Sequence, residues 1–235
     1  MLQFMFQQPE QPPTGKYAEV DQLLEKFAMQ MERRSSKADD NKEKWTKFEI
    51  WTLGLQASLR ELYASHYAAQ KFREKIVLNS IKEMDAEQKL DYARYVYFDK
   101  NGFIRVFSLL DKLGTFLNAL LELKTEKIKA HFSYFTVLRT MRERQVHVKL
   151  TKPLNELKEL SKEPTHRLRK RRNTETHYMN SEMHDDLIQR TRMYGQELVL
   201  ENLDQQMNDL AVGLDLAMQS IKLTFEYAQT LVHRN

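Results

Sequence analysis

The residues best suited to chemistry lie in the run 172–177, which begins with Arg172 and Asn173 and ends with His177. A histidine imidazole titrates near neutral pH and therefore suits proton transfer. An arginine guanidinium matches two phosphate oxygens, and an asparagine amide orients a phosphate or the guanidinium without adding charge. Together these residue types fit metal-free cleavage of RNA, which needs a base for the 2′-hydroxyl, a cation for the phosphorane and an acid for the leaving oxygen.

A basic stretch directly precedes this run. Residues 161–180 include six basic and two acidic residues, a local excess of 6 − 2 = +4, which equals the excess of the whole chain, 37 − 33 = +4. The basic bias is therefore concentrated here, where it would hold an RNA backbone electrostatically. The predicted nucleic-acid-binding residues are Arg167, Arg169, Lys170 and Arg171.

The spacing within the run restricts how it can act. Positions five apart on a straight α-helix differ in direction by about 140°. Arg172 and His177 converge on one face only if a helix starts between them, and Asn173 or Thr174 is a suitable N-cap for such a start. Without such a start, one copy of the chain cannot bring the two residues to one helix face.

Other groupings of these residue types are interpreted as structural. Arg142 with His147 and Arg60 with His66 have a similar spacing, but neither arginine is followed by asparagine, and both pairs lie in helical patterns. The histidines His177 and His184 have acidic neighbours that are more typical of a solvated surface than of a metal site. The chain has no cysteine, which excludes thiolate ligands, and we predict neither a metal nor a cofactor.

Long helices are predicted to position these residues. Residues 14–152 contain no proline, and apolar residues recur there at three- and four-residue steps. The predicted helices cover 20–31, about 41–78, about 86–99, 106–120, 128–138 and 203–228. We expect a turn at 100–102 and an irregular segment between the last two helices, because Pro153 and Pro164 interrupt it. The heptad-like last helix packs either within the chain or against a partner.

The sequence resembles the HEPN superfamily, whose helical bundles carry an arginine, a polar residue and, a few positions later, a histidine, as at Arg172, Asn173 and His177. A second segment, 107–118, is similar to an upstream helix of several stand-alone bacterial HEPN branches, with an Asp-Lys-Leu-Gly step at 111–114. The resemblance implies an all-α, antiparallel helical bundle with long helices, to which this chain adds N-terminal helices. It also implies a homodimer whose two-fold axis brings two motifs into one cleft.

Three further residues are predicted to support the motif. Asp111 and Asn118 are seven apart and share a helix face, so they brace the motif, or Asp111 simply pairs with a nearby basic side chain. Some HEPN proteins carry a tyrosine two residues after the histidine. Here Tyr178 follows His177 immediately and Met179 occupies that place, which puts control through a modified tyrosine in doubt.

The chain of 235 residues is expected to form a single helical domain over 16–235, with its core at about 45–232, after a disordered tail at 1–15. It has no apolar run long enough for a membrane span, and a cytoplasmic location is expected. The favoured function is a metal-independent endoribonuclease. The alternatives are a non-catalytic HEPN module that binds RNA or a protein partner such as an antitoxin, and a helical scaffold that dimerises.

Overall fold

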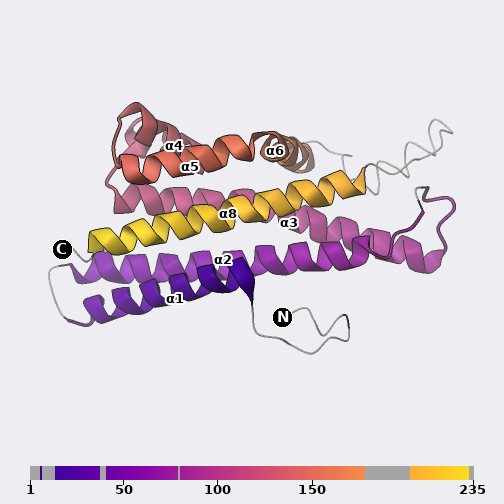
Figure 1. The fold of residues 1–235 in the computed structure, drawn as a ribbon, viewed down its shortest axis with the longest axis horizontal. Helices are drawn as coiled ribbons and strands as arrows, with labels where there is room; N and C mark the ends of the chain where they lie inside the picture. Colours follow the sequence, from indigo (N-terminus) through magenta and orange to yellow (C-terminus); the bar gives the residue numbers. More distant parts are fainter. Residues whose placement is uncertain (1–5, 7–13, 38–40, 79, 178–201, 233–235) are drawn as a thin grey trace. The chain divides into compact units, whose positions relative to one another are not determined.

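The structure is a computed structural model that describes residues 6, 14–37, 41–78, 80–177 and 202–232. Within these residues the fold is all-α, as predicted, and contains no β-strand (Figure 1). The helices are α1 (Gly15–Ser35), α2 (Lys42–Arg73), α3 (Ala86–Leu120), the 3-10 helix η2 (Thr125–Lys127), α4 (Tyr134–Glu143), α5 (Val148–Leu160), α6 (Lys162–His177) and α8 (Leu203–Val232). Most of the predicted tail at 1–15 lies outside the described residues.

The predicted turn at 100–102 is wrong, because α3 runs through it without interruption. Gly102 is a packing residue and not a turn residue. A Cβ atom at this position would lie 2.9 Å from Cδ2 of Leu210, so the missing side chain lets α8 approach α3 closely.

The segment predicted to be irregular is helical and contains α5 and α6. Pro164 lies in the first turn of α6. Backbone N–H groups in the first turn have no acceptor within the helix, so a proline there costs no helical hydrogen bond. Pro153 lies inside α5, which tolerates the loss of one backbone hydrogen bond. The helix predicted at 128–138 begins later, at Tyr134, because Ser133 forms a capping box with Thr136.

The helices form two compact units, and α2, α3 and α8 each contribute residues to both. The unit that we call the α6 unit comprises Met1–Pro9, Leu62–Val106 and Lys162–Leu214, and the α5 unit comprises Glu10–Glu61, Phe107–Ser161 and Asp215–Asn235. A single domain over 16–235 stays a prediction.

The core of the α5 unit is built on four phenylalanines, one from each long helix. Phe225 of α8 packs on Phe27 of α1 and Phe116 of α3, with ring centroids 4.9 and 4.7 Å apart, and Phe48 of α2 lies 5.4 Å from Phe116. All four side chains are at most 2% exposed. Such large, buried rings make this cluster the main apolar anchor of the unit.

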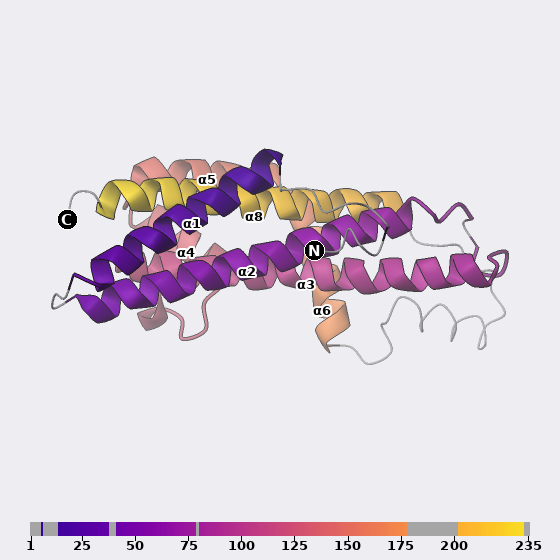
Figure 2. The same cartoon turned by 90° about the horizontal axis from the view of Figure 1, so that it is seen from below.

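Polar contacts define the directions of the helices in the α5 unit. Gln56 of α2 donates to the Asp21 carboxylate of α1 at 2.9 Å, and the Arg34 guanidinium lies over the Trp45 ring, so α1 and α2 are antiparallel (Figure 2). Two ion pairs show that α8 runs parallel to α1. They are Lys16–Asp215 at 2.7 Å and Glu19–Lys222 at 3.0 Å.

The segment between α3 and α4 is attached to α3 by two of the predicted supporting residues. Asp111 accepts a hydrogen bond from the N–H of Tyr134 at 3.0 Å, at the start of α4. The Asn118 amide accepts from the N–H of Thr125 at 2.9 Å and donates to Glu126 at 2.8 Å. Asp111 and Asn118 therefore position the turn and α4, and their bracing of the motif stays a prediction.

A matched pair of glycine substitutions tests the close packing of α3 against the start of α4 at Tyr134. In Gly114→Ala the new Cβ would lie 2.8 Å from the Tyr134 Cα, where backbone cannot move aside cheaply, whereas a Cβ at Gly54 of α2 has nothing within 4 Å. We expect Gly114→Ala to lower the free energy of unfolding by about 1–3 kcal/mol. Gly54→Ala should raise it by about 0.5–1 kcal/mol, because alanine favours the helix. Urea unfolding of both variants measures the difference, and equal effects would contradict the packing.

Candidate nucleic-acid interface on α6

Helix α6 is fixed in its unit by an apolar contact with α3 and α8. Its Leu168 side chain is fully buried. A Cβ atom at Gly213 of α8 would lie 2.8 Å from Cδ1 of Leu168 and 3.1 Å from Cγ2 of Val106 in α3. The glycine thus makes room for Leu168, and this contact determines which face of α6 points inward.

Two arginines of the basic stretch also point inward, to buried carboxylates. Arg167 donates from Nε and Nη2 to both oxygens of Asp209, at 2.8 and 2.6 Å, and Asp209 is 2% exposed. This bidentate hydrogen bond raises the pKa of Arg167. Arg171 pairs with the fully buried Asp99, and its guanidinium lies over the Phe103 ring, 4.7 Å from the centroid. These contacts hold α6 against α8 and α3.

The other two predicted RNA-binding residues, Arg169 and Lys170, are exposed. They share the outer side of α6 with three further exposed residues at helical spacing, which are Lys162, His166 and Asn173. We call these five residues the outer face of α6. The outer face presents three cations, a histidine and an amide to solvent, which are groups that can contact phosphates. The exposed carboxylate of Glu163 lies beside it in the first turn of α6.

The motif residues lie on one continuous helix. No helix starts between Arg172 and His177, because α6 is helical from Lys162 to His177, which is the last described residue before 202. Arg172 is half-buried, Asn173 is exposed, and the Thr176 hydroxyl donates to the Arg172 carbonyl at 2.9 Å. Arg172 and His177 therefore occupy positions about 140° apart around α6. Tyr178 and His184 lie outside the described residues.

A lysine of α3 holds the end of α6. Lys100 pairs with Glu175 at 3.1 Å, and both side chains are less than a fifth exposed, at 16% and 19%. The acidic residue inside the motif is thereby engaged within the protein. Its negative charge is balanced there, so it opposes an approaching phosphate less than an isolated carboxylate would.

The histidines of the two other arginine–histidine pairs, His147 and His66, are partly buried. His147 is the N-cap residue of α5, and its Nδ1 lies 2.9 Å from the Tyr227 hydroxyl. Burial lowers the pKa of His147, and it also lowers the pKa of His66, which is half-buried in α2. Both histidines are thus biased toward the neutral form.

The lowered pKa of His66 makes the free energy of unfolding depend on pH. Because its pKa in the folded state is below the ordinary value of about 6.5, both states bind no proton above that pH. Below it, the unfolded chain takes up the proton first, so the free energy of unfolding falls as the pH decreases. We expect His66→Gln to flatten this fall below about pH 6.5. Thermal unfolding against pH measures the effect, and the exposed His131→Gln is the control.

Metal binding and membrane insertion find no support in the part of the chain that the structure describes. No group of three histidine, cysteine or acidic side chains there is placed to hold a metal ion. None of the described helices is long and apolar enough to cross a membrane.

Asp99 and Asp209, the two carboxylates that hold α6, are the residues near the candidate interface that sequence reasoning missed. Each lies in a stretch of helical periodicity, Asp99 after Phe98 in α3 and Asp209 before Leu210 in α8. A lone carboxylate on an apolar helix face needs a partner when buried. That signal was present, but only the packing shows that the partners are Arg171 and Arg167.

Comparison with known proteins gives one match. The sequence model of the family described as Cthe2314-like HEPN matches residues 51–229, which is more than half of the chain. No curated protein and no solved structure matches. The matched range includes the whole of α6 and the segment 107–118.

Proposed function

This chain belongs to the Cthe2314-like HEPN family, and we propose that it is an endoribonuclease that needs no metal ion. The observation that carries the proposal is the outer face of α6, where exposed Arg169, Lys170 and Asn173 lead along one helix to His177. An RNA strand lying on this face would meet cations first and the histidine at the end of the helix.

Each motif residue has a defined part in the proposed reaction. A base removes the proton of a ribose 2′-hydroxyl, and the 2′-oxygen attacks the adjacent phosphorus. The bond from phosphorus to the 5′-oxygen breaks, an acid protonates that oxygen, and the products are a 2′,3′-cyclic phosphate and a 5′-hydroxyl. His177 acts as the base or the acid, Arg172 stabilises the charge on the phosphorane, and Asn173 orients the phosphate.

The positions of Arg172 and His177 favour a site that is shared between two copies of the chain. Along α6 their positions are about 140° apart around the helix axis. A homodimer with a two-fold axis would place Arg172 of one copy near His177 of the second. Such an isologous arrangement creates two equivalent sites.

Cleavage of a mixed RNA pool in EDTA tests the proposal. We expect the purified wild-type protein to cut the pool equally well with EDTA and with Mg²⁺, and to leave cyclic-phosphate and 5′-hydroxyl ends. Cleavage that disappears in EDTA would contradict the mechanism, because the proposed groups need no metal. RNA that stays intact at high protein concentration would remove the catalytic proposal for that pool.

A non-catalytic RNA-binding module is the second candidate. The same observation favours it, since a helix that separates Arg172 from His177 can bind phosphates without bringing an acid and a base together. Salt-sensitive binding of RNA in the absence of cleavage would identify this function. A protein partner or antitoxin that covers the outer face of α6 would compete with RNA in the same assay.

A further inference from the structure

A cavity of about 230 Å³ lies in the α5 unit, where the ends of several helices meet. The start of α2, the end of α3, the start of α5 and the end of α8 each contribute residues to its wall. Its apolar lining consists of Trp45, Phe48, Leu120, Leu121, Leu231 and Val232. Phe48 belongs to the buried phenylalanine cluster, so the lining continues into the core of the unit.

Three polar side chains complete the wall of this cavity. Lys44 contributes an ammonium group, Glu122 a carboxylate and His147 an imidazole. Lys44 and Glu122 are exposed, so both stand where the cavity opens to solvent, whereas His147 is half-buried. The Lys44 ammonium also lies 5.6 Å from the centroid of the Trp45 ring. The cavity thus offers one positive and one negative group beside an apolar interior.

The imidazole of His147 is held in place by α8. Its Nδ1 lies 2.9 Å from the Tyr227 hydroxyl, and the two rings meet edge to face with their centroids 5.8 Å apart. Burial lowers the pKa of His147, so the ring is mainly neutral at pH 7. The contact with Tyr227 uses only one ring nitrogen. The second, Nε2, can therefore donate or accept a hydrogen bond, according to the tautomer.

Glu122 has a backbone conformation that glycine would adopt more easily. Its φ is +51°, and the N–H of Leu123 donates to the Asn118 carbonyl at 3.0 Å, so a Schellman motif ends α3. Glycine is the usual residue at this position, and glutamate costs free energy there. The substitution places a carboxylate at the cavity. Backbone strain of this kind concentrates at ligand-binding sites, and His147 shares it with a φ of +49°.

We propose that this cavity binds a small zwitterion with an apolar body, which is the chemistry of a free branched or aromatic amino acid. The apolar body packs against Trp45 and the leucines of the lining. The ammonium group of the ligand pairs with Glu122, and its carboxylate pairs with Lys44. The volume lies below the roughly 300–1,000 Å³ of pockets for drug-sized molecules, so a ligand of amino-acid size fits.

The charges at the opening favour a zwitterion over simpler ligands. A small carboxylate would gain from Lys44 but would be repelled by Glu122, and a small amine would meet the reverse. A hydrocarbon would fill the interior and leave both charged groups without a partner. A molecule with one charge of each sign is therefore the best match to this wall.

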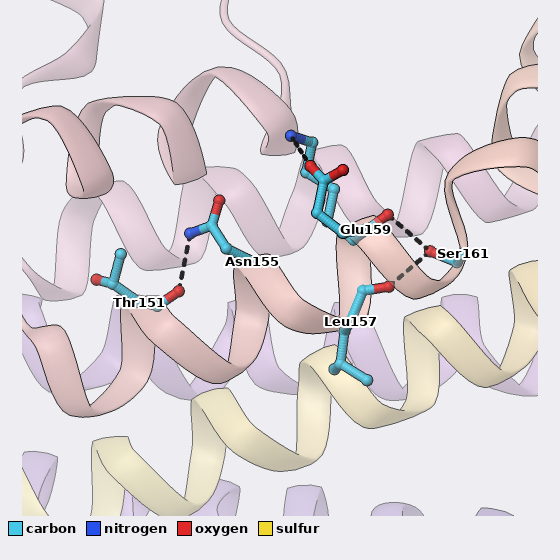
Figure 3. Close-up of polar contacts among 6 residues, drawn as sticks. Thr151, Asn155, Leu157, Glu159 and Ser161 are labelled. Atoms are coloured by element: carbon cyan, nitrogen blue, oxygen red, sulfur yellow. Dashed lines mark hydrogen bonds and ion pairs between the residues drawn. The ribbon is translucent and has the colours of Figure 1, made fainter.

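The larger groove of about 680 Å³ along α5 lacks this arrangement. There the Asn155 amide donates to the Thr151 carbonyl at 2.8 Å, and Lys158 pairs with Glu159 at 3.1 Å (Figure 3). These polar groups are engaged within α5 itself. Charged side chains of the groove are exposed along one helix, with no apolar interior of aromatic rings beside them. We therefore assign the ligand to the smaller cavity.

Trp45 can report the binding directly. The chain has two tryptophans, so Trp51→Phe leaves Trp45 as the only one, and its ring lines the cavity. Titration of this full-length variant with L-leucine should change the tryptophan fluorescence to a plateau, with a dissociation constant on the order of 0.1–1 mM. Titration calorimetry of the wild-type protein measures the same binding without relying on fluorescence.

Two analogues of leucine and two charge-removing variants test the assigned contacts. Isocaproate lacks the amino group and isopentylamine lacks the carboxylate, and each should bind about three- to tenfold more weakly than leucine. Lys44→Gln should weaken leucine by a similar factor and leave isopentylamine unchanged. Glu122→Gln should weaken leucine and leave isocaproate unchanged. The exposed Lys129→Gln and Glu156→Gln, which lie outside the cavity in the same unit, are the controls.

Three results would overturn the proposal. Leucine that gives neither heat nor a fluorescence change up to about 20-fold above the expected dissociation constant would exclude this ligand class. An analogue that binds as tightly as leucine would mean that one of the two charged contacts is absent. Leucine binding that both charge-removing variants leave intact would place the ligand elsewhere.

This inference goes beyond the proposed ribonuclease and does not rest on it. The cavity and helix α6 belong to different units of the chain. Loss of RNA cleavage with intact leucine binding would remove the ribonuclease alone. Intact cleavage without leucine binding would remove the inference alone.

Discussion

His177→Ala is expected to reduce the cleavage of RNA in EDTA by about 10²- to 10⁴-fold, the usual contribution of a positioned proton-transfer group. Arg172→Ala should reduce it by about 10²-fold or more, because the phosphorane loses a cation placed to stabilise its charge. Initial rates at saturating RNA report this loss directly. If the two residues act in one step, the double variant should lose little more than His177→Ala alone.

Matched controls separate this loss from a general effect of removing charge. His131→Ala and Arg139→Ala replace exposed residues of the same types near and in α4, and neither should change the rate. RNA binding by His177→Ala should stay within about twofold of wild type, since a neutral histidine adds little to phosphate attraction. A His177→Ala variant that cuts as fast as wild type would contradict the assigned role.

Arg167→Ala and Arg169→Ala both remove an arginine from the basic stretch, but we expect the first to lower stability and the second to weaken RNA binding. Arg167→Ala should lower the free energy of unfolding, because it removes both hydrogen bonds from the buried Asp209 carboxylate. The exposed Arg169→Ala should change it by less than about 0.5 kcal/mol. Instead, it should weaken RNA binding and reduce the slope of log affinity against log salt by about one.

Urea unfolding and RNA titration at several salt concentrations together test this division. Asp209→Asn should destabilise the protein much as Arg167→Ala does, because it leaves the guanidinium without its carboxylate partner in the ion pair. A stable Arg167→Ala variant that has lost RNA affinity would show that Arg167 binds phosphate and that its contact with Asp209 is dispensable.

The long helices were predictable from the sequence because their signals are local. The absence of proline and the three- and four-residue apolar steps led to α1, α2 and α8 with small errors at the ends. The turn predicted at Gly102 and the breaks predicted at the prolines failed for one reason. Glycine and proline have local effects that packing can override, and here Leu210 fills the space beside Gly102.

The candidate site was predictable only in part. The basic stretch is visible in the sequence, but its division into arginines that hold α6 and cations that face solvent depends on contacts 42 and 72 residues apart in the chain. The helical continuity of the motif was likewise missed, because Asn173 and Thr174 cap helices well yet also occur within them.

The contacts of the inward-facing arginines predict which positions of α6 can vary among homologues. Arg167 binds Asp209 with a planar fork that lysine does not possess, and Arg171 combines an ion pair with the face of Phe103. Among homologues, positions 167 and 171 should therefore retain arginine and covary with 209 and 99. Positions 169 and 170 should exchange arginine and lysine, because the phosphate contact that we propose for these exposed residues needs only the charge.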